Sequence, residues 1–563
     1  MTSTSDKKKI QYSRLLFWAT VIALMIPNVA LCFTEGLSVS ASATNILLPL
    51  GIYILLMSLT KNPGKMVWWL FILIFFAAFQ MVLLYLFGRG VIAVDMFLNL
   101  VTTNPGEAME LLDNLVPAVV GVFVVYLPIL CFGIVSIHQG WKLPDFSRVL
   151  YRKTAITFVG MELVCMALAS TTSSSDEADA RYSISDDLYP ANAFYNLGLA
   201  FVRNQQSNDY VEASAAFRFH ATSEHPKDSS EVYVLVIGET ARAHNFSIYG
   251  YPRDTNPMLS VTPGIVAFDH VTTQSNTTHK SVPMLLSAAE AGNFSRLYTE
   301  KGILAAFREA GFHTTFISNQ LPNHSFIDFL GQQADECHFL KEEAKEKQSD
   351  SDEINIYDID LIPKVSEIIG GHRHKKEFIV LHTYGSHFNY RERYPAQMSF
   401  FKPDTKAEAK PENRTDLTNA YDNTIRYTDF VLRSLIDLVG QSNATSAVLY
   451  TSDHGENIFD DDRNLFLHAS PRASLYELEV PFIVWTSPSY AALHPSVVST
   501  LKAQRHKQVQ SSVSAFHTML QIGGVKTSYR DDTKSVASPL FKETPRMYLT
   551  DHNEAVSISR ILD

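Results

Sequence analysis

The hydrophobic and polar positions divide the chain into two parts with different patterns. Up to about residue 170 the sequence consists mainly of long apolar stretches, and after about residue 229 short β-rich runs alternate with helical ones. Five stretches are long enough, or nearly so, to cross a bilayer, at 14–34, 43–59, 67–87, 116–138 and 154–171. We therefore predict a transmembrane domain of five helices over residues 1–171. The first stretch lacks the small-residue cleavage pattern of a signal peptide, which favours an uncleaved anchor.

Basic residues in the connecting segments predict the orientation of these spans, because cytoplasmic loops are rich in Lys and Arg. They gather at the N-terminus, after the second span and after the fourth, as Lys7, Lys8, Lys9, Lys61, Lys65, Lys142, Arg148, Arg152 and Lys153. The loop between the third and fourth spans carries Arg89 alone against Glu107, Glu110 and Asp113. The N-terminus is therefore expected in the cytoplasm. With an odd number of spans, everything after residue 171 is expected outside, which in a bacterium places the chain in the inner membrane and its soluble part in the periplasm.

Residues 172–228 are predicted to connect the two parts. The run SSSDEADA is typical of a flexible segment, and the aromatic stretch YPANAFYNLGLAFVR that follows is typical of a helix. That helix would either lie on the membrane surface, with Phe194, Tyr195, Leu197, Leu199 and Phe201 inserted, or pack on the soluble domain.

From residue 229 to 563 the pattern predicts a soluble α/β domain. Nearly continuous apolar runs at 232–239, 313–319, 377–387, 446–456 and 480–487 indicate buried strands, and stretches such as 301–311, 357–370 and 413–440 indicate helices between them. This alternation is typical of a largely parallel sheet, whose working residues lie beyond the carboxyl ends of the strands. Glu239, His387, Asp453 and His454 occupy such positions.

Composition narrows the partners of the chain. The formal net charge of −11 is modest for 563 residues, and no basic stripe stands out in the sequence. Both observations argue against nucleic acid as the main partner. Three of the four cysteines lie in apolar segments, so Cys337 has no partner in the soluble part and no structural disulfide is expected.

The strand ends carry the chemistry of a metal site. Glu239 and Asp453 offer carboxylate oxygens, and His454, His468 and His387 offer imidazoles, a mixed set that suits zinc, with manganese next. SDHGE and GETAR are the stronger signals, although SDHGE alone could still be a surface turn. A lone histidine is more often structural, which makes His468 weak by itself and is what we expect for His382.

A hydroxyl activated by such a metal is predicted in TTQSNTTHKSVPMLLS. Coordination lowers the pKa of a hydroxyl that must attack phosphorus. Thr278 is the expected nucleophile, with Thr277 in reserve, and Lys280 and Asn276 are nearby groups that could contact phosphate oxygens. A helix opened by the Ser-Val-Pro segment would direct its free N–H groups at the phosphate. Taken alone, a Thr- and Ser-rich stretch is usually a surface loop.

Several motifs occur in a fixed order: VIGETAR, NTTHKSVPM, LHTYGSHFNYRERYP, YDNTIRYTDF and TSDHGE with a later His. Together they resemble the phosphoethanolamine transferases of Gram-negative bacteria, which include lipid A-modifying enzymes that confer polymyxin resistance. The likeness covers nearly the whole chain and implies a fold of the alkaline phosphatase and sulfatase superfamily.

The resemblance implies specific roles. Glu239, Thr278, Asp453 and His454 would hold one zinc firmly, and His387 and His468 would contact the phosphoryl group or a second zinc. Phosphatidylethanolamine would be the donor, and the intermediate a phosphoethanolamine–threonine. Asn99 and Glu107 match the spacing with which the family holds the donor headgroup, although an ordinary solvated loop would have the same sequence. Met284 stands where many members have a cysteine, which puts the rigidity of that loop and the acceptor surface in doubt.

The predicted function is transfer of phosphoethanolamine from phosphatidylethanolamine to an envelope acceptor, with lipid A favoured over core sugars, periplasmic glucans and proteins. Alternatives are a lipoteichoic-acid-synthase-like transfer of glycerol phosphate, and a non-catalytic membrane protein that retains the fold. A sulfatase is disfavoured, because the oxidisable Cys or Ser that would supply formylglycine is missing.

Overall fold

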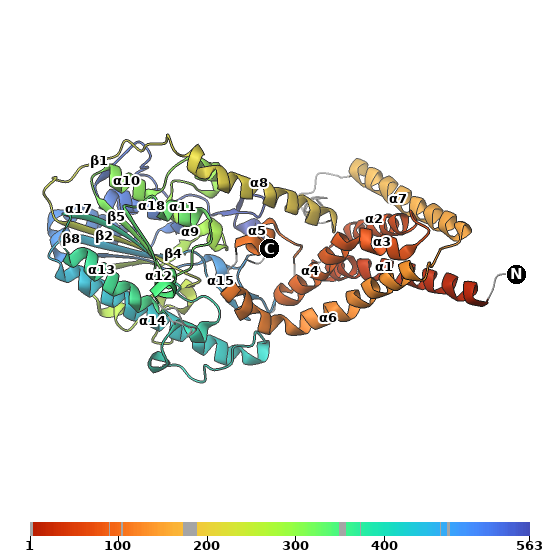
Figure 1. Cartoon of the computed structure of the whole chain (residues 1–563). Helices are drawn as coiled ribbons and strands as arrows, with labels where there is room; N and C mark the ends of the chain where they lie inside the picture. The colour runs from red at the N-terminus through yellow and green to blue at the C-terminus, as the bar shows by residue number, and fades with distance from the viewer. Residues whose placement is uncertain are drawn as a thin grey trace. The chain divides into compact units, whose positions relative to one another are not determined.

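The computed structural model describes residues 4–35, 37–88, 90–102, 105–172, 188–347, 356–371, 373–461, 463–469 and 473–562, apart from some side chains at the ends of these ranges and those of 99–114. It separates into two compact units, one of residues 1–101 and 111–202 and the other of residues 102–110 and 203–563. We describe each unit by itself (Figure 1).

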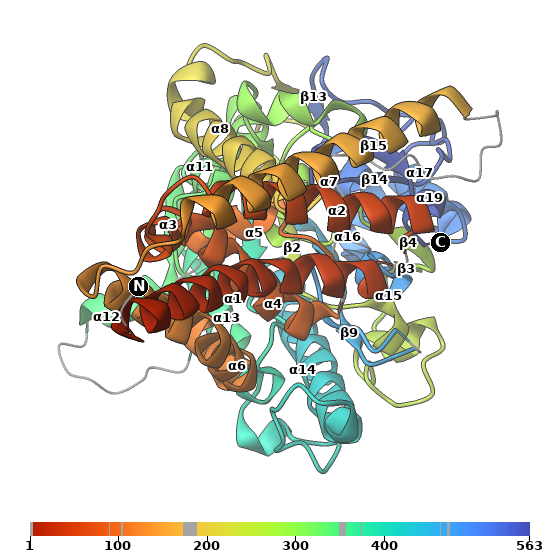
Figure 2. The same ribbon diagram turned by 90° about the vertical axis from the view of Figure 1, so that its right-hand side faces the viewer.

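The first unit consists of apolar helices, as its pattern predicts. They are α1 (Thr4–Thr34), α2 (Val39–Met57), α3 (Pro63–Trp69), α4 (Phe71–Phe87), α5 (Val94–Thr102), α6 (Pro105–His138) and α7 (Asp145–Thr172). Figure 2 shows α1, α2 and α7 running side by side. Their buried faces share a core that includes Phe17, Tyr53 and Ala155.

Length and composition qualify three described helices as membrane spans, Asp6–Thr34, Val39–Met57 and Leu115–His138. The pair Pro63–Trp69 and Phe71–Leu86 qualifies as a fourth if its 62° bend is one broken span. Four of the five expected spans therefore correspond to these helices. The fifth, 154–171, belongs to α7, whose side chains from residue 166 are not described, and it stays a prediction.

The second unit is built around a seven-stranded sheet, in the order β3-β11-β8-β2-β7-β5-β6. The strands are β2 (Glu231–Gly238), β3 (Ile265–Phe268), β5 (His313–Ser318), β6 (Glu336–Phe339), β7 (Lys376–His382), β8 (Thr445–Ser452) and β11 (Phe482–Thr486). Strands β8, β2, β7, β5 and β6 are parallel, and β11 pairs antiparallel with both β8 and β3. The expected α/β fold with a largely parallel sheet is confirmed.

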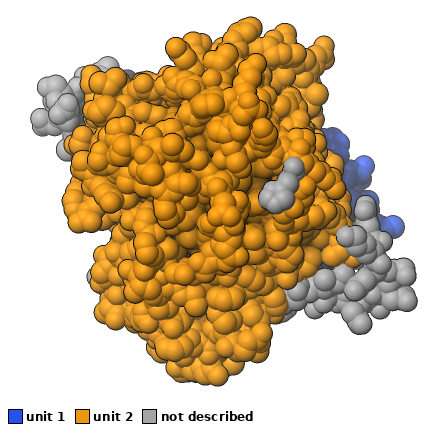
Figure 3. Space-filling view, turned by 90° about the vertical axis from the view of Figure 1, so that its left-hand side faces the viewer, with its two compact units in different colours: residues 1–101, 111–202 blue, residues 102–110, 203–563 orange. Residues whose placement is uncertain are grey.

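Helices cover both faces of this sheet, as Figure 1 shows. One core packs under α9 (Thr278–Leu286), α10 (Ile303–Glu309), α11 (Phe326–Gly331) and α18 (Ser511–Ile522). The other lies under α13 (Leu361–Gly370) and α14 (Arg414–Gln441). Every residue of the central strand β2 is buried, which explains its unbroken apolar run. On the face shown in Figure 3 this unit forms one continuous body.

The aromatic stretch after the membrane helices is helical, as predicted. It forms α8 (Ala191–Ala213), which contributes Ala193 and Ala200 to a core of the first unit and Tyr210 to a core of the second. The Tyr210 hydroxyl donates to the Glu300 carbonyl at 2.8 Å. Phe194, Tyr195 and Phe201 are 45%, 48% and 69% exposed, so both expectations for this helix, on the membrane surface or on the soluble domain, stay open.

Candidate functional site

Two neighbouring parallel strands end at the same edge of the sheet and bring three ligand-type residues together. Glu239 directly follows β2, and Asp453 and His454 directly follow β8, which pairs with β2 along its whole length. Among the described residues, these three form a group whose ligand atoms all lie within 4.8 Å of one another. All three side chains are fully buried. The strand-end positions singled out in the sequence therefore converge on one point.

The Thr278 hydroxyl joins this group from the start of helix α9. Thr278 is the first residue of α9, and its Oγ1 lies 3.1 Å from Oε1 of Glu239 and 3.1 Å from Nε2 of His454. Thr277, the reserve nucleophile, is the N-cap and its hydroxyl lies 3.1 Å from that of Ser275 instead. The helix begins three residues before the expected Ser-Val-Pro start, so Pro283 lies inside it.

Hydrogen bonds fix which atoms of Asp453 and His454 face the group. Oδ1 of Asp453 accepts from the backbone N–H groups of Thr240 and His454, at 3.0 and 2.7 Å. Oδ2 is therefore directed at the site and lies 3.2 Å from Nε2 of His454. Nδ1 of His454 lies 2.9 Å from the Gly455 carbonyl, which favours the tautomer whose Nε2 lone pair points at Glu239 and Thr278.

Two residues that the sequence did not single out orient Glu239. Nε2 of Gln320 donates to Oε2 of Glu239 at 3.1 Å and to the Thr383 carbonyl at 3.0 Å. The Thr240 hydroxyl donates to Oε1 at 2.8 Å. Partners of this kind hold a metal-ligating carboxylate in place. Thr240 lies within the VIGETAR motif, whereas a lone Gln such as Gln320 carries no recognisable signal in the sequence.

His387 and His468 also come to this site. The His468 ring lies 4.1 Å from that of His454 and 6.3 Å from that of His387, measured between centroids. Oε1 of Glu456 lies 3.2 Å from Nδ1 of His468 and so orients it. Burial lowers the pKa of His387 to about 3 and lowers the pKa of His468 well below its ordinary value. Both rings are therefore neutral near pH 7.

A metal cation fits the donor set. Two buried carboxylates face one another around an imidazole and a hydroxyl, and among the described residues Oδ2 of Asp453 accepts no hydrogen bond. Burial alone would lower the pKa of His454, but the carboxylates of Asp453 and Glu239 outweigh it and raise that pKa. Such a concentration of negative charge needs a positive partner. The buried carboxylate, imidazole and hydroxyl donors suit zinc.

The remaining predicted residues lie elsewhere or are not described. Lys280 is buried, and its ammonium donates to the Thr550 carbonyl at 3.0 Å. Asn276 donates to Oε1 of Glu477 at 2.9 Å and accepts from the Tyr548 hydroxyl at 2.7 Å. The side chains of Asn99 and Glu107 fall outside the described part of the chain. Contacts of these four residues with a substrate stay predictions.

This architecture defines an α/β domain with a cluster of possible metal ligands at the carboxyl edge of its sheet. Residues 231–525 match the family model described as Sulfatase. The chain belongs to the sulfatase family, and this agrees with the superfamily that the motifs implied.

Relatives with described activities are phosphoethanolamine transferases. EptC of Escherichia coli (strain K12) is 29% identical over 328 residues, which cover 56% of this chain and 54% of that protein. The Kdo(2)-lipid A phosphoethanolamine 7''-transferase of the same strain is 28% identical over 345 residues, 60% of this chain and 58% of that one. The chain thus spans little more than half the length of these relatives. The resemblance drawn from the motifs is confirmed.

Solved structures support both units. The integral membrane protein lipooligosaccharide phosphoethanolamine transferase A from Neisseria meningitidis matches 93% of this chain and 98% of its own, with a TM-score of 0.74 at 20% identity, which shows a shared fold. The C-terminal periplasmic domain of EptC from Escherichia coli, in complex with Zn, matches 61% of this chain and 97% of its own, with a TM-score of 0.54 at 26% identity.

Proposed function

We propose that this protein transfers phosphoethanolamine from phosphatidylethanolamine to an envelope acceptor, with lipid A as the favoured acceptor, through a covalent intermediate on Thr278. The observation that carries the proposal is the placement of the Thr278 hydroxyl within 3.1 Å of both Glu239 and His454. The similarity to named phosphoethanolamine transferases, one of them a Kdo(2)-lipid A phosphoethanolamine 7''-transferase, supports the group transferred and the acceptor.

The site favours a zinc ion, held by Glu239, Thr278, Asp453 and His454. When bound, zinc supplies the positive charge that lowers the pKa of a ligating hydroxyl and neutralises negative charge on phosphoryl oxygens. The Zn complex of the related EptC domain supports this choice of metal. Metal analysis of the purified protein would distinguish one ion from two, the second near His387 and His468, and zinc from manganese, the less favoured metal.

The first half-reaction forms one phosphorus–oxygen bond and breaks another. Oγ1 of Thr278 attacks the phosphorus of the donor, and the bond from phosphorus to the glycerol oxygen breaks. The threonine proton passes to the leaving oxygen, so that diacylglycerol departs as an alcohol. We propose that His387 and His468, whose rings lie 6.3 Å apart between centroids, stabilise the phosphoryl group or shuttle that proton.

The second half-reaction reverses the roles. A hydroxyl or phosphate oxygen of the acceptor attacks the same phosphorus, and the bond to Oγ1 of Thr278 breaks. Oγ1 of Thr278 takes the proton released by an attacking hydroxyl, or a solvent proton where an ionised phosphate oxygen attacks, and the acceptor carries phosphoethanolamine. On lipid A this adds a cationic group to an anionic surface, which would weaken the binding of cationic peptides.

The apolar helices of the first unit support a multi-pass protein of the inner membrane. A membrane anchor keeps the site within reach of lipid headgroups. The loop charges support a cytoplasmic N-terminus and a catalytic domain in the periplasm. The test uses cells whose outer membrane has been made permeable and whose inner membrane is intact. In these cells, a cysteine introduced into the second unit should react with a thiol reagent that cannot cross the inner membrane.

The donor distinguishes this proposal from its nearest rival. Purified full-length protein is incubated with phosphatidylethanolamine or phosphatidylglycerol labelled in the headgroup, and label is followed onto protein and acceptor. Transfer from the ethanolamine lipid supports the proposal, and use of the glycerol lipid alone would replace it with the glycerol phosphate transferase. Absence of transfer, with metal bound, would favour a non-catalytic binding protein. Thr277→Ala is the matched control, because its hydroxyl bonds to Ser275 rather than to the metal-site residues.

A further inference from the structure

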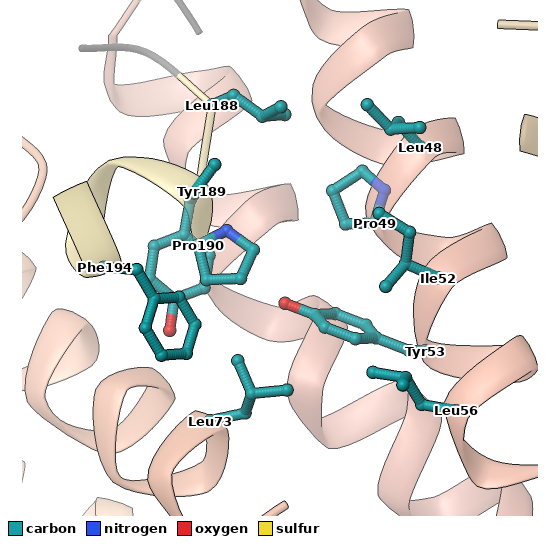
Figure 4. Close-up of a pocket in the computed structure, with 11 residues that line it drawn as sticks. Leu48, Pro49, Ile52, Tyr53, Leu56, Leu73, Leu188, Tyr189, Pro190 and Phe194 are labelled. Carbon is teal, nitrogen blue, oxygen red and sulfur yellow. The ribbon is translucent and has the colours of Figure 1, made fainter. Parts of the chain in front are cut away.

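The first unit contains a cavity of about 320 Å³ whose lining is apolar. Helix α2 lines it with Leu48, Ile52 and Tyr53, and α4 with Leu73. Tyr189, which precedes α8, and Phe194, in the first turn of α8, line the opposite side. Figure 4 shows the side chains of α2 on one side of this space and those of Tyr189 and Phe194 on the other. The Tyr53 hydroxyl is directed toward Tyr189 and Pro190. All of these residues belong to the first unit, so the cavity is a property of that unit alone.

Directional bonds hold the wall of the cavity in place. Nδ2 of Asn28, which is fully buried in α1, donates to the Tyr189 carbonyl at 2.7 Å and to Oδ1 of Asn45 at 3.3 Å. Nδ2 of Asn196 donates to the Ile92 carbonyl at 2.7 Å. Polar side chains inside membrane helices are costly and are retained where they perform a task, and Asn28 in α1 is such a side chain. It fixes the main chain at Tyr189, which lines the cavity.

Aromatic packing fixes the same wall from the other side. The Phe194 ring lies 5.0 Å from that of Phe76 in α4, at an interplanar angle of 73°, an edge-to-face arrangement. Tyr53 and Tyr189 are each 1% exposed, so neither side chain can swing aside without disturbing its neighbours. The cavity is therefore a preformed feature rather than a local packing defect.

The chemistry of the lining selects the occupant. An apolar cavity does not retain water, and even one of about 150 Å³ stays dry and binds small hydrocarbons. Helix α2 has the length and composition of a membrane span, and Ile52 on its cavity side is 40% exposed. The medium in contact with such a helix is lipid hydrocarbon. The volume lies near the lower end of ligand pockets, which run from about 300 to 1,000 Å³, and so fits one chain rather than a whole lipid.

We propose that this cavity binds one acyl chain of a membrane phospholipid, seated between Tyr53 and Leu73 of the membrane helices and Tyr189 and Phe194 at the start of α8. The bound chain would complete the packing between α2, α4 and the segment that enters α8. The proposal concerns the first unit and does not rest on the proposed transfer reaction.

Photolabelling of the full-length protein tests this site. The protein is reconstituted in nanodiscs with a trace of phosphatidylethanolamine or phosphatidylglycerol, each carrying a diazirine near the end of one acyl chain, and cross-linked residues are mapped by mass spectrometry. Label is expected at Tyr53, Leu73, Tyr189 and Phe194 from both lipids. Leu73→Trp places a larger side chain in the cavity. The indole ring and an acyl chain cannot both fit there, so labelling should fall at least about fivefold.

A neighbouring residue provides the matched control. Ile72 precedes Leu73 on α4, is 43% exposed and does not line the cavity, so Ile72→Trp should leave the labelling unchanged. If Leu73→Trp does not fold, Ile52→Trp replaces it, since the partial exposure of Ile52 makes the larger side chain tolerable. Labelling that is spread evenly over lipid-facing residues, or that survives a filled cavity, would overturn the proposal. Labelling by the ethanolamine lipid alone would show that the headgroup determines binding, and would overturn the proposal that the cavity recognises the acyl chain.

Discussion

The hydroxyl oxygen of Thr278 lies 3.1 Å from Oε1 of Glu239, although 39 positions separate the two residues in the sequence. Glu239 is placed by the end of strand β2 and Thr278 by the start of helix α9. A hydroxyl held this close to a buried carboxylate, with an imidazole on its other side, is positioned to lose its proton once a cation shares the site. This relationship gives the proposed reaction its nucleophile.

Replacement of the nucleophile should abolish transfer. Thr278→Ala removes the attacking oxygen, and we expect a loss in kcat on the order of 1000-fold or more, measured as labelled phosphoethanolamine released from the donor lipid. Thr278→Ser keeps the oxygen and should retain measurable transfer. Thr277→Ala should stay close to the parent protein, since Thr277 bonds to Ser275. Equal losses in Thr277→Ala and Thr278→Ala would shift the nucleophile or point to a general disruption of α9.

Gln320 should act on metal binding rather than on the chemical step. Its amide donates to Oε2 of Glu239, so Gln320→Leu leaves a ligating carboxylate without one of its orienting bonds. We expect zinc affinity to fall about 10- to 100-fold, measured by competition with a chromophoric chelator. Activity should return at high zinc concentration. Unchanged affinity together with lost activity would show that Gln320 acts on the substrate instead.

Glu456 should act by positioning His468. Oε1 of its carboxylate lies 3.2 Å from Nδ1 of His468, and the Tyr390 hydroxyl donates to Oε2 at 3.2 Å. Glu456→Gln keeps the size of the side chain but changes what it can accept, and kcat should fall about 10- to 100-fold with little change in KM. Tyr390→Phe is the control, since it removes the other contact only and should cost less. A rise in KM at constant kcat would contradict a positioning role.

The pH dependence of stability should depend on His517. Burial lowers the pKa of this residue to about 3, and Nδ1 accepts a hydrogen bond from the backbone N–H of Asp531 at 3.1 Å. Below its ordinary pKa of 6.5 the unfolded chain binds a proton that the native state does not. Stability is therefore full above pH 6.5 and falls as the pH decreases toward 3, by roughly 2 kcal/mol at about pH 5.

His517→Asn isolates this contribution, because an amide oxygen can take the place of Nδ1 as acceptor without gaining charge. Melting temperatures of both proteins are measured in detergent between about pH 7.5 and pH 5. The parent should lose more than the variant over this range. Parallel pH profiles would mean that His517 is protonated in the native state, or is not responsible for the acid sensitivity. Carboxylates elsewhere affect both proteins alike and cancel in the difference.

The parts of the fold that follow from local pattern were predictable. Strands such as β2 and β8 are buried throughout, so their apolar runs stand out, and the parallel order places Glu239, Asp453 and His454 at one edge. Thr278 was singled out by its motif, and the helix that begins at this residue starts earlier than its Pro suggested. The antiparallel direction of β11 was not predictable, since its apolar run looks like the others and pairing partners are set by the tertiary fold.

Residues whose importance depends on a distant partner left no signal. Gln320 reaches Glu239 across 81 positions, and only the fold reveals the contact. The same applies to Lys280, which the sequence grouped with the phosphate contacts because of its neighbours and which donates to the Thr550 carbonyl, 270 positions away. Asn28 in the membrane unit is a third case, since its role in holding the Tyr189 carbonyl follows from packing between helices.

The central claim is that Thr278 carries the transferred group, and peptide mass spectrometry of the protein after brief reaction with phosphatidylethanolamine tests it most directly. The account predicts phosphoethanolamine on Thr278 when acceptor is withheld, its loss when acceptor is added, and no adduct in Asp453→Asn. An adduct on another residue, or transfer to acceptor by Thr278→Ala protein at the parent rate, would contradict it.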